Sequence, residues 1–389
     1  MRFTHRDHPG RCVRLAYCLN VHAAETLEDL LCGLETITLP LRERLARPAE
    51  RFGVGMYLPC AVARELETTP SKRERLAALL ERERLDPFTF NAFPYGGFHA
   101  AQVKRKVYSP DWTTPERAAY TALVASLALR LSNGAGRVSI STHAGGWGAD
   151  FVRDPWRAVE GLADVRATLD GLERLHGGSI VLGIEAEPRS NANTTAEAAA
   201  IAREAGVALC LDACHSAVEF EDARAALDAA LGAGPLAKLQ YTSALRLVDP
   251  ASHRAAWRAL LALDEPRYLH QVTARRAGGL ERWDDLDALA GIDAAGIEEL
   301  RCHFHVPVDR EELGAGLSTT RAHAEELLER LLADPLRWRD PELHVEIETY
   351  TWDVLPGAAR GPGTLVEGLE REYRHVIGRL EARGWTRGG

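Results

Sequence analysis

Carboxylate, imidazole and amide side chains stand at the ends of several short apolar segments of this sequence. A parallel barrel gathers the carboxyl ends of its strands at one mouth, so residues far apart in the chain can meet around one ion. Charged groups in apolar surroundings are costly unless they have partners or bind a metal. The pattern therefore predicts an enzyme with a metal centre. The residues that form it are Glu185, Glu187, Asp212, His215, Gln240, His303, His305, Glu346 and Glu348.

The segments that carry these residues alternate with longer stretches rich in Ala, Leu, Arg and Glu. This alternation is typical of repeated βα units around a parallel sheet, and we predict a (β/α)8 TIM barrel. The predicted strands are about Val13–Cys18, Gly53–Leu58, Phe88–Ala92, Arg137–Thr142, Ser179–Glu185, Ala208–Asp212, Leu239–Thr242 and His344–Tyr350. The predicted helices include Lys72–Arg84, Pro115–Ser132, Pro155–Leu175, Thr195–Ala205 and Phe220–Leu231.

The chain between the seventh and eighth predicted strands is longer than one helix requires. It holds a poorly periodic region, about 248–298, and a ninth strand-like segment, Leu300–Val306. We predict an insertion over 248–298. Leu300–Val306 would then either extend the seventh strand or serve as the true barrel strand. Residues 1–389 are thus expected to form a single domain with a long insertion before the last strand.

Composition narrows the function classes. The chain has 389 residues, 46% hydrophobic and 26% charged, enough to bury a large core. A formal charge of −9 argues against nucleic acid or an anionic membrane as the main partner. Seven cysteines without a CxxC pair, and no secretory or membrane segment, predict a cytoplasmic location. A homo-oligomer is compatible with the sequence.

The order of the polar residues resembles the xylose isomerase-like TIM barrels, which include sugar and sugar-phosphate isomerases and epimerases. In that family a Glu ends strand five, Asp-x-x-His follows strand six, a His or Gln ends strand seven with an Arg six residues on, and a Glu ends strand eight. The resemblance implies a divalent cation held by Glu185, Asp212, Gln240 and Glu348, with His215 and Arg246 on substrate oxygens.

A second likeness covers nearly the whole chain and concerns short motifs. YCLNVH, FNAFPYGGFH, VKRKVYSPDW, YLHQV, HFHVP and ETYTWDVLP resemble the EboE proteins, a TIM-barrel branch known as metabolite-traffic proteins. This branch label supports the fold more than it specifies a reaction.

His303 and His305 depart from the simple isomerase pattern. At positions i and i+2 of one strand the two imidazoles share a face, with Phe304 opposite. We expect them to ligate the same ion or a second one; the alternative is a pair of core histidines with satisfied ring nitrogens. For Asp212 and His215 the alternative is a helix cap and a surface histidine. Carboxylates favour Mg²⁺ or Mn²⁺, and added imidazoles favour Mn²⁺, Co²⁺ or Zn²⁺.

Further residues are predicted to contact substrate from the loops around the mouth. Lys104 could grip a substrate phosphate, although a solvated charge run at 104–106 explains it equally well. His99 belongs to a glycine-containing loop, and His143 precedes a Gly-rich turn that could cradle an anion. His270 is a candidate only through the EboE likeness.

These observations favour a divalent-metal-dependent isomerase or epimerase of carbohydrate metabolism. Its substrate would be a sugar, sugar phosphate or cyclitol-like polyol, with proton transfer at a metal-bound enediolate. Glu185 and Glu348 would act as acid and base, with His215 and Arg246 assisting. Two alternatives stay open: a multinuclear metal-dependent hydrolase or phosphodiesterase, as in the endonuclease branch of this fold, and a metabolite-binding carrier.

Overall fold

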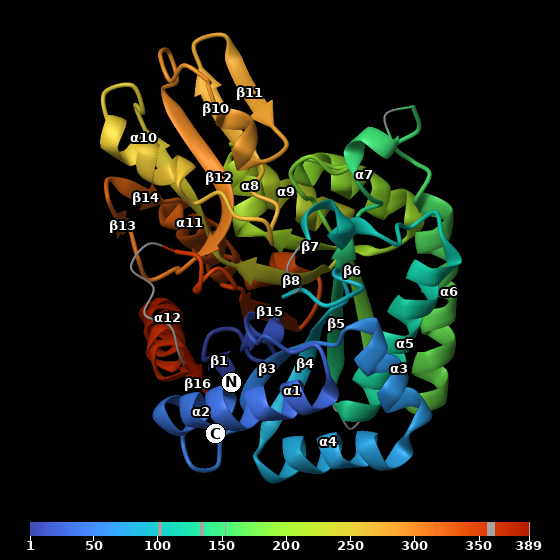
Figure 1. Ribbon diagram of the computed structural model, residues 1–389. Helices are drawn as coiled ribbons and strands as arrows, with labels where there is room; N and C mark the ends of the chain where they lie inside the picture. Colours follow the sequence, from blue (N-terminus) through green and yellow to red (C-terminus); the bar gives the residue numbers. More distant parts are fainter. Residues whose placement is uncertain (100–102, 133–135, 152, 356–361, 389) are drawn as a thin grey trace.

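Eight parallel strands close into a barrel in the computed structural model, which describes residues 1–99, 103–132, 136–151, 153–355 and 362–388 (Figure 1). Neighbouring strands pair in chain order, and the last pairs with the first. This confirms the predicted TIM barrel, and each predicted strand end falls within three residues of the observed one. The barrel strands are β2 (Cys12–Cys18), β3 (Phe52–Tyr57), β4 (Leu85–Asn91), β5 (Arg137–His143), β6 (Ser179–Glu185), β7 (Ala208–Asp212), β8 (Leu236–Tyr241) and β15 (Glu342–Ile347).

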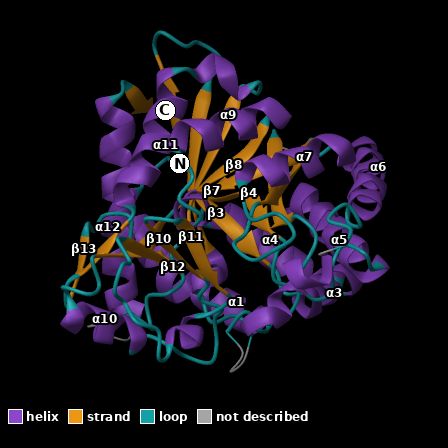
Figure 2. Ribbon diagram, turned by 90° about the horizontal axis from the view of Figure 1, so that it is seen from above, coloured by secondary structure: helices purple, strands orange, loops and turns teal. Residues whose placement is uncertain are grey.

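Helices surround the barrel, as the view from above shows (Figure 2). Their apolar faces and the strands share one large core. Thr194 opens α7 with a capping box, as the Thr-x-x-Glu spacing dictates. The helices are α1 (Leu27–Gly33), α2 (Leu39–Leu45), α3 (Cys60–Thr68), α4 (Pro70–Arg82), α5 (Pro115–Leu131), α6 (Val159–His176), α7 (Thr195–Ala205), α8 (Ala213–Val218), α9 (Ala223–Ala233), α10 (Arg254–Leu261), α11 (Arg321–Ala333) and α12 (Pro362–Ala382).

A second, antiparallel sheet follows β8 and returns to the barrel before β15. Its spatial order is β11-β10-β12-β9-β14-β13, and it has a hydrophobic core of its own. In Figure 1 this sheet, in yellow to orange, stands over the barrel end where β6 and β7 finish. Its strands are β9 (Ser243–Val248), β10 (Val272–Arg276), β11 (Gly279–Trp283), β12 (Glu299–Val306), β13 (Glu312–Gly314) and β14 (Leu317–Thr319).

The predicted role of Leu300–Val306 is wrong. This segment belongs to β12, which pairs antiparallel with β9 on one side and β10 on the other. It therefore neither extends the seventh barrel strand nor serves as a barrel strand itself. The second sheet begins at Ser243 and ends at Thr319, so it extends beyond the region 248–298 at both ends.

The two ends of the described chain lie together at the opposite end of the barrel (Figure 1). There β1 (Arg2–His5) pairs antiparallel with β2, and β16 (Trp385–Arg387) pairs with β1. Among the described residues, none of the helices is long and apolar enough to cross a membrane.

Candidate metal centre

A cavity with about 520 Å³ of empty space, part of it open to solvent, lies where the barrel mouth meets the second sheet. Carboxylates, imidazoles and amides form its polar part, and apolar side chains form the rest. Its lining residues come from the loops after β2, β4, β6, β7 and β15 and from the second sheet itself. The polar lining residues are Asn20, Asn91, Lys104, Glu185, Glu187, His215, His303, His305 and Glu348.

Three imidazoles converge in this cavity through their Nε2 atoms. His215, on α8 directly after β7, lies 3.2 Å from the Nε2 of His303 and 3.2 Å from that of His305. The Nε2 atoms of His303 and His305 are 3.0 Å apart. All three side chains are buried. The barrel thus supplies one imidazole and β12 of the second sheet supplies two.

The other ring nitrogen of each imidazole faces an oxygen acceptor. Nδ1 of His215 lies 2.9 Å from the carbonyl oxygen of Ala186, and Nδ1 of His305 lies 2.9 Å from that of Glu348. Nδ1 of His303 lies 2.5 Å from Oε1 of Gln271. A carbonyl oxygen can only accept, so each Nδ1 carries the proton and each neutral ring presents an Nε2 lone pair.

Gln271 is itself fixed in orientation. Its amide nitrogen donates to Oε1 of Glu187 and to the carbonyl oxygen of Pro188, both at 2.9 Å. The amide oxygen is therefore the atom left to accept from His303. This arrangement selects the tautomer of His303 through a buried side chain of the second sheet.

Three lone pairs at this separation repel one another unless a cation lies among them. Burial lowers the pKa of His303 and of His305 well below the usual value, and the neighbouring His215 lowers both further. A bound proton is therefore disfavoured on these rings. The described residues fit a divalent metal ion, because neutral imidazoles with Nδ1 anchored to oxygen are the usual form of a histidine ligand.

Buried carboxylates flank the imidazoles. Oε2 of Glu187 lies 3.6 Å from Nε2 of His215, and ligand atoms of Glu187, His215 and His303 lie within 4.8 Å of one another. Ligand atoms of Asp212, His215 and His305 satisfy the same limit. Oδ1 of Asp212 accepts the backbone N–H groups of Cys214 and His215, which caps α8. Its buried Oδ2 has no hydrogen-bond partner among the described residues, and neither has Oε1 of Glu185.

Burial also dominates the titration of these acids. It raises the pKa of Glu185, Glu187 and Asp212 to about 7 each. The electrostatic interaction with the nearby His215 opposes the shift at Glu185 and Glu187, and the two N–H donors oppose it at Asp212. Acids gathered in this way need protons or a cation, which is a second argument for a metal ion.

Glu348 also lines the cavity, and its carboxylate accepts hydrogen bonds from three side-chain amides. Its Oε1 accepts from the amides of Asn20 at 2.7 Å and Asn91 at 3.0 Å, and its Oε2 accepts from the amide of Gln240. Burial raises its pKa well above the usual value, and the charges of Glu185 and Asp212 add to the shift. Three amide donors thus orient this carboxylate toward the cavity.

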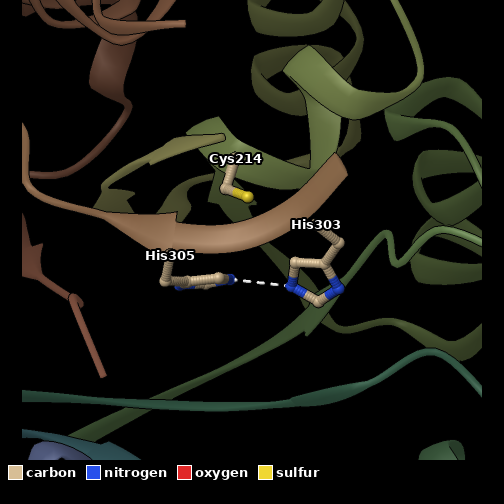
Figure 3. A group of neighbouring side chains, drawn as sticks. All are labelled: Cys214, His303 and His305. Carbon is tan, nitrogen blue, oxygen red and sulfur yellow. Dashed lines mark hydrogen bonds between the residues drawn. The ribbon is translucent and has the colours of Figure 1, made fainter. Parts of the chain in front are cut away.

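Cys214 is a weaker candidate ligand. Its sulfur lies within 4.8 Å of ligand atoms of His303 and His305. Figure 3 shows the two imidazoles extending from one side of β12 and Cys214 on the other. The thiol lies 3.6 Å from the carbonyl oxygen of Phe304, and burial raises its pKa well above the usual value. Both features disfavour the thiolate that a metal would need.

The structure brings most of the predicted metal ligands together but gives Gln240 a different environment. Glu185, His303, His305 and Glu348 line the cavity. Gln240 uses both polar ends within the protein, because its amide nitrogen donates to Glu348 and its oxygen accepts the Cys210 thiol at 2.8 Å. It therefore supports Glu348 and has no free ligand atom.

Arg246, which we predicted at the substrate, does not line the cavity. It lies on β9, after the chain has left the barrel, and its guanidinium pairs with Glu299 at 3.0 Å. The six-residue spacing from Gln240 fits the family pattern, but the strand that carries Arg246 belongs to the second sheet.

The four residues predicted to contact substrate do not gather in the cavity, and only Lys104 lines it. Lys104 lines the cavity but pairs with Asp285 at 2.7 Å. Nε2 of His99 lies 2.6 Å from the carbonyl oxygen of Asn20, and His99 is not among the described residues that line the cavity. His143 is fully buried under Phe93. His270 stacks on Phe304 and contacts Glu265 at 3.1 Å.

Sequence reasoning assigned no role to Asn20, Asn91 or Gln271, and it included Glu187 in the metal-type pattern without giving it a role of its own. Glu187 was visible as a second carboxylate two residues after Glu185. Asn20 follows β2 closely, and Asn91 is the last residue of β4. Their amides orient Glu348, a contact that requires the closed barrel.

Fold and site together define a (β/α)8 barrel whose mouth holds a candidate metal centre shared with a second sheet. No model of a known protein family matches the chain, and no curated protein matches it. The resemblance to the EboE branch therefore stays a prediction.

Three solved structures align with nearly the whole of this chain. The IolI protein with a bound zinc atom aligns over 95% of this chain and 99% of its own, with a TM-score of 0.50 and 12% identity. A probable 3-DHS dehydratase, AsbF from Bacillus anthracis, aligns over 93% of this chain and 98% of its own, with a TM-score of 0.48 and 12% identity. A D-tagatose 3-epimerase-like protein aligns over 95% of this chain and 99% of its own, with a TM-score of 0.46 and 10% identity. At such identities the likeness to the IolI structure establishes the fold and leaves the reaction open.

Proposed function

We propose that this protein is a divalent-metal-dependent isomerase or epimerase of a small hydroxycarbonyl substrate. The convergence of three Nε2 lone pairs, each anchored through Nδ1, is the observation that carries the proposal. His215, His303 and His305 would hold the ion, and Asp212 or Glu187 would complete its ligand set. When bound, the ion would stabilise negative charge that develops on the substrate oxygens.

Imidazole ligands shift the expected metal. Three histidines with one or two carboxylates suit Zn²⁺, Co²⁺ or Mn²⁺ better than Mg²⁺, which prefers oxygen ligands and water. The zinc atom in the IolI structure is consistent with such an ion in a barrel of this shape.

Proton transfer is assigned to Glu185 and Glu348, two of the three glutamates that line the cavity. Glu185 carries an unpartnered oxygen, and Glu348 is held by three amides. A pKa near 7 allows Glu185 to take a proton from carbon and return it, because a general acid–base works best close to the ambient pH. Glu348, whose pKa is also raised by burial, would supply or receive the second proton.

The proposal is tested by solvent exchange in deuterated water. Metal-loaded protein should place deuterium on the carbon beside the carbonyl of at least one compound in a panel of small hydroxycarbonyl compounds, which ranges from sugars and sugar phosphates to apolar-substituted hydroxyketones. Glu185→Gln or Glu348→Gln should lower that exchange by roughly 10²–10⁴-fold, because the amide keeps the size of the side chain but cannot act as a base. Glu160→Gln, an exposed position on α6, is the matched control and should leave exchange unchanged. Full exchange in both cavity variants would contradict the proposal.

A metal-dependent hydrolase is the second candidate, and one observation favours it. Two ligand groups share His215, one with Glu187 and His303 and the other with Asp212 and His305, which offers room for more than one ion. Two or three ions per chain, together with phosphodiester cleavage and no isomerisation, would support this reading. Tight metabolite binding without any turnover would instead support a carrier.

A further inference from the structure

The candidate cavity has two chemically different parts. One part holds the imidazoles and carboxylates described above. The rest of the lining is built by the loop after β4, the segment before β10 and the residues after β15, and its side chains are largely apolar. It adjoins the imidazoles at Tyr350, whose ring centroid lies 4.6 Å from that of His305. The lining residues of this part, called the wall below, are Phe93, Pro94, Phe98, Val103, Val107, Tyr268, Leu269 and Tyr350.

These apolar side chains offer few hydrogen bonds to a ligand. Val103, Val107 and Leu269 are aliphatic. Phe98 packs edge to face on Tyr350, with ring centroids 4.8 Å apart. The hydroxyl of Tyr268 lies 3.1 Å from Nδ1 of His99, so its polar tip is engaged within the protein. A chain of substrate hydroxyl groups against this wall would lose hydrogen bonds to water without replacement.

The wall also offers no free positive charge. Lys104 is the one lysine or arginine among the described residues that line the cavity. Its ammonium pairs with Asp285 at 2.7 Å, and Asp264 lies 3.9 Å away. A substrate phosphate would have to displace Asp285 to reach this charge. The wall therefore selects against a phosphate group at this end of the substrate.

Resting on the proposed function, we infer that the substrate is amphipathic. Its metal-chelating oxygens lie against the imidazoles and carboxylates, and an uncharged apolar substituent, aryl or branched aliphatic, lies against Phe98, Val103 and Leu269. The substrate class is thus an apolar-substituted hydroxycarbonyl compound. A phosphorylated or fully hydroxylated sugar does not match this wall.

Hydroxamates of different size test this inference, because they chelate a divalent ion in the manner of an enediolate. Zinc-loaded protein should bind benzohydroxamate at least tenfold more tightly than acetohydroxamate by calorimetry, since the phenyl ring is removed from water. Phosphonoacetohydroxamate should bind no more tightly than acetohydroxamate. Tighter binding of the phosphonate, or equal binding of benzohydroxamate and acetohydroxamate, would overturn the inference.

A substitution in the wall tests whether the phenyl ring of benzohydroxamate binds there. Leu269→Ala should weaken benzohydroxamate roughly fivefold and leave acetohydroxamate unchanged, because it removes apolar surface from the wall alone. Leu280→Ala, at an exposed position on β11 of the second sheet, should leave the affinity for both hydroxamates unchanged. Loss of both hydroxamates from protein that still holds zinc would contradict the placement of the phenyl ring. Protein that retains no zinc would instead overturn the proposed function itself.

Discussion

At the scale of single residues, the acceptors on Nδ1 determine what the three imidazoles can do. Gln271 is the only one of these acceptors that is a side chain; the other two are backbone carbonyls of Ala186 and Glu348. Its amide oxygen contacts Nδ1 of His303, the ring nitrogen that is not part of the Nε2 cluster, so Gln271 is a positioning residue that acts through His303.

Replacement of Gln271 by methionine should weaken metal binding. Methionine has a similar volume but offers no oxygen acceptor, so the tautomer of His303 is no longer selected. We expect zinc affinity to fall roughly 10–100-fold, measured by competition with a chromogenic chelator. Thermal unfolding of the metal-free variant serves as the control for folding. A folded variant with parental zinc affinity would show that Gln271 does not position His303.

The residue types at the ends of barrel strands were sufficient to predict most of the candidate ligands. Glu185 and Asp212 end their strands, and His303 and His305 share a face by simple alternation. Gln240 and Arg246 fitted the family spacing equally well. Their partners, Glu348 and Glu299, become neighbours only through strand pairing, so sequence spacing could not separate a ligand from a support.

At the scale of elements, a buried acid on α12 joins the segments that carry the site. Oε1 of Glu372 accepts from the Thr349 hydroxyl at 2.6 Å, next to Glu348, and from the backbone N–H of Val308 at 3.1 Å, just after β12. Burial raises the pKa of Glu372 to about 8, although the bond from Thr349 opposes the shift.

The ionisation of buried Glu372 should make the free energy of unfolding depend on pH. The folded pKa of Glu372 lies above the unfolded one, so the folded chain binds more protons and loses stability as pH rises from about 4.5 to 8. Glu372→Gln cannot ionise and should remove that part of the loss, up to roughly 3 kcal/mol between pH 5 and 8. Urea unfolding of metal-free parent and variant at both pH values measures it. Parallel pH profiles for the two proteins would refute the assignment.

Element boundaries were predictable where apolar runs met turn residues, and every barrel strand was located this way. The pairing of Leu300–Val306 was not. A strand buried on both faces has the same local pattern in a parallel barrel and in an antiparallel sheet. Its true partners, β9 and β10, are decided by the closure of the second sheet, which no local segment encodes.

At the scale of the whole molecule, the candidate metal centre connects two bodies with separate cores. His215 belongs to the barrel, and His303 and His305 belong to the second sheet. A metal ion bound by all three would link these cores directly, so the second sheet is a necessary part of the site. An insertion that merely decorated the barrel would contribute no ligand.

The most direct test of this account is the X-ray absorption spectrum of the zinc-loaded protein. The account predicts one ion per chain with about three imidazole ligands, at roughly 2.0–2.1 Å, and one or two carboxylate oxygens. Multiple scattering from the imidazole rings distinguishes this shell from one made of oxygen alone. A spectrum with oxygen ligands only, or with at most one imidazole, would contradict a metal centre shared between the barrel and the second sheet.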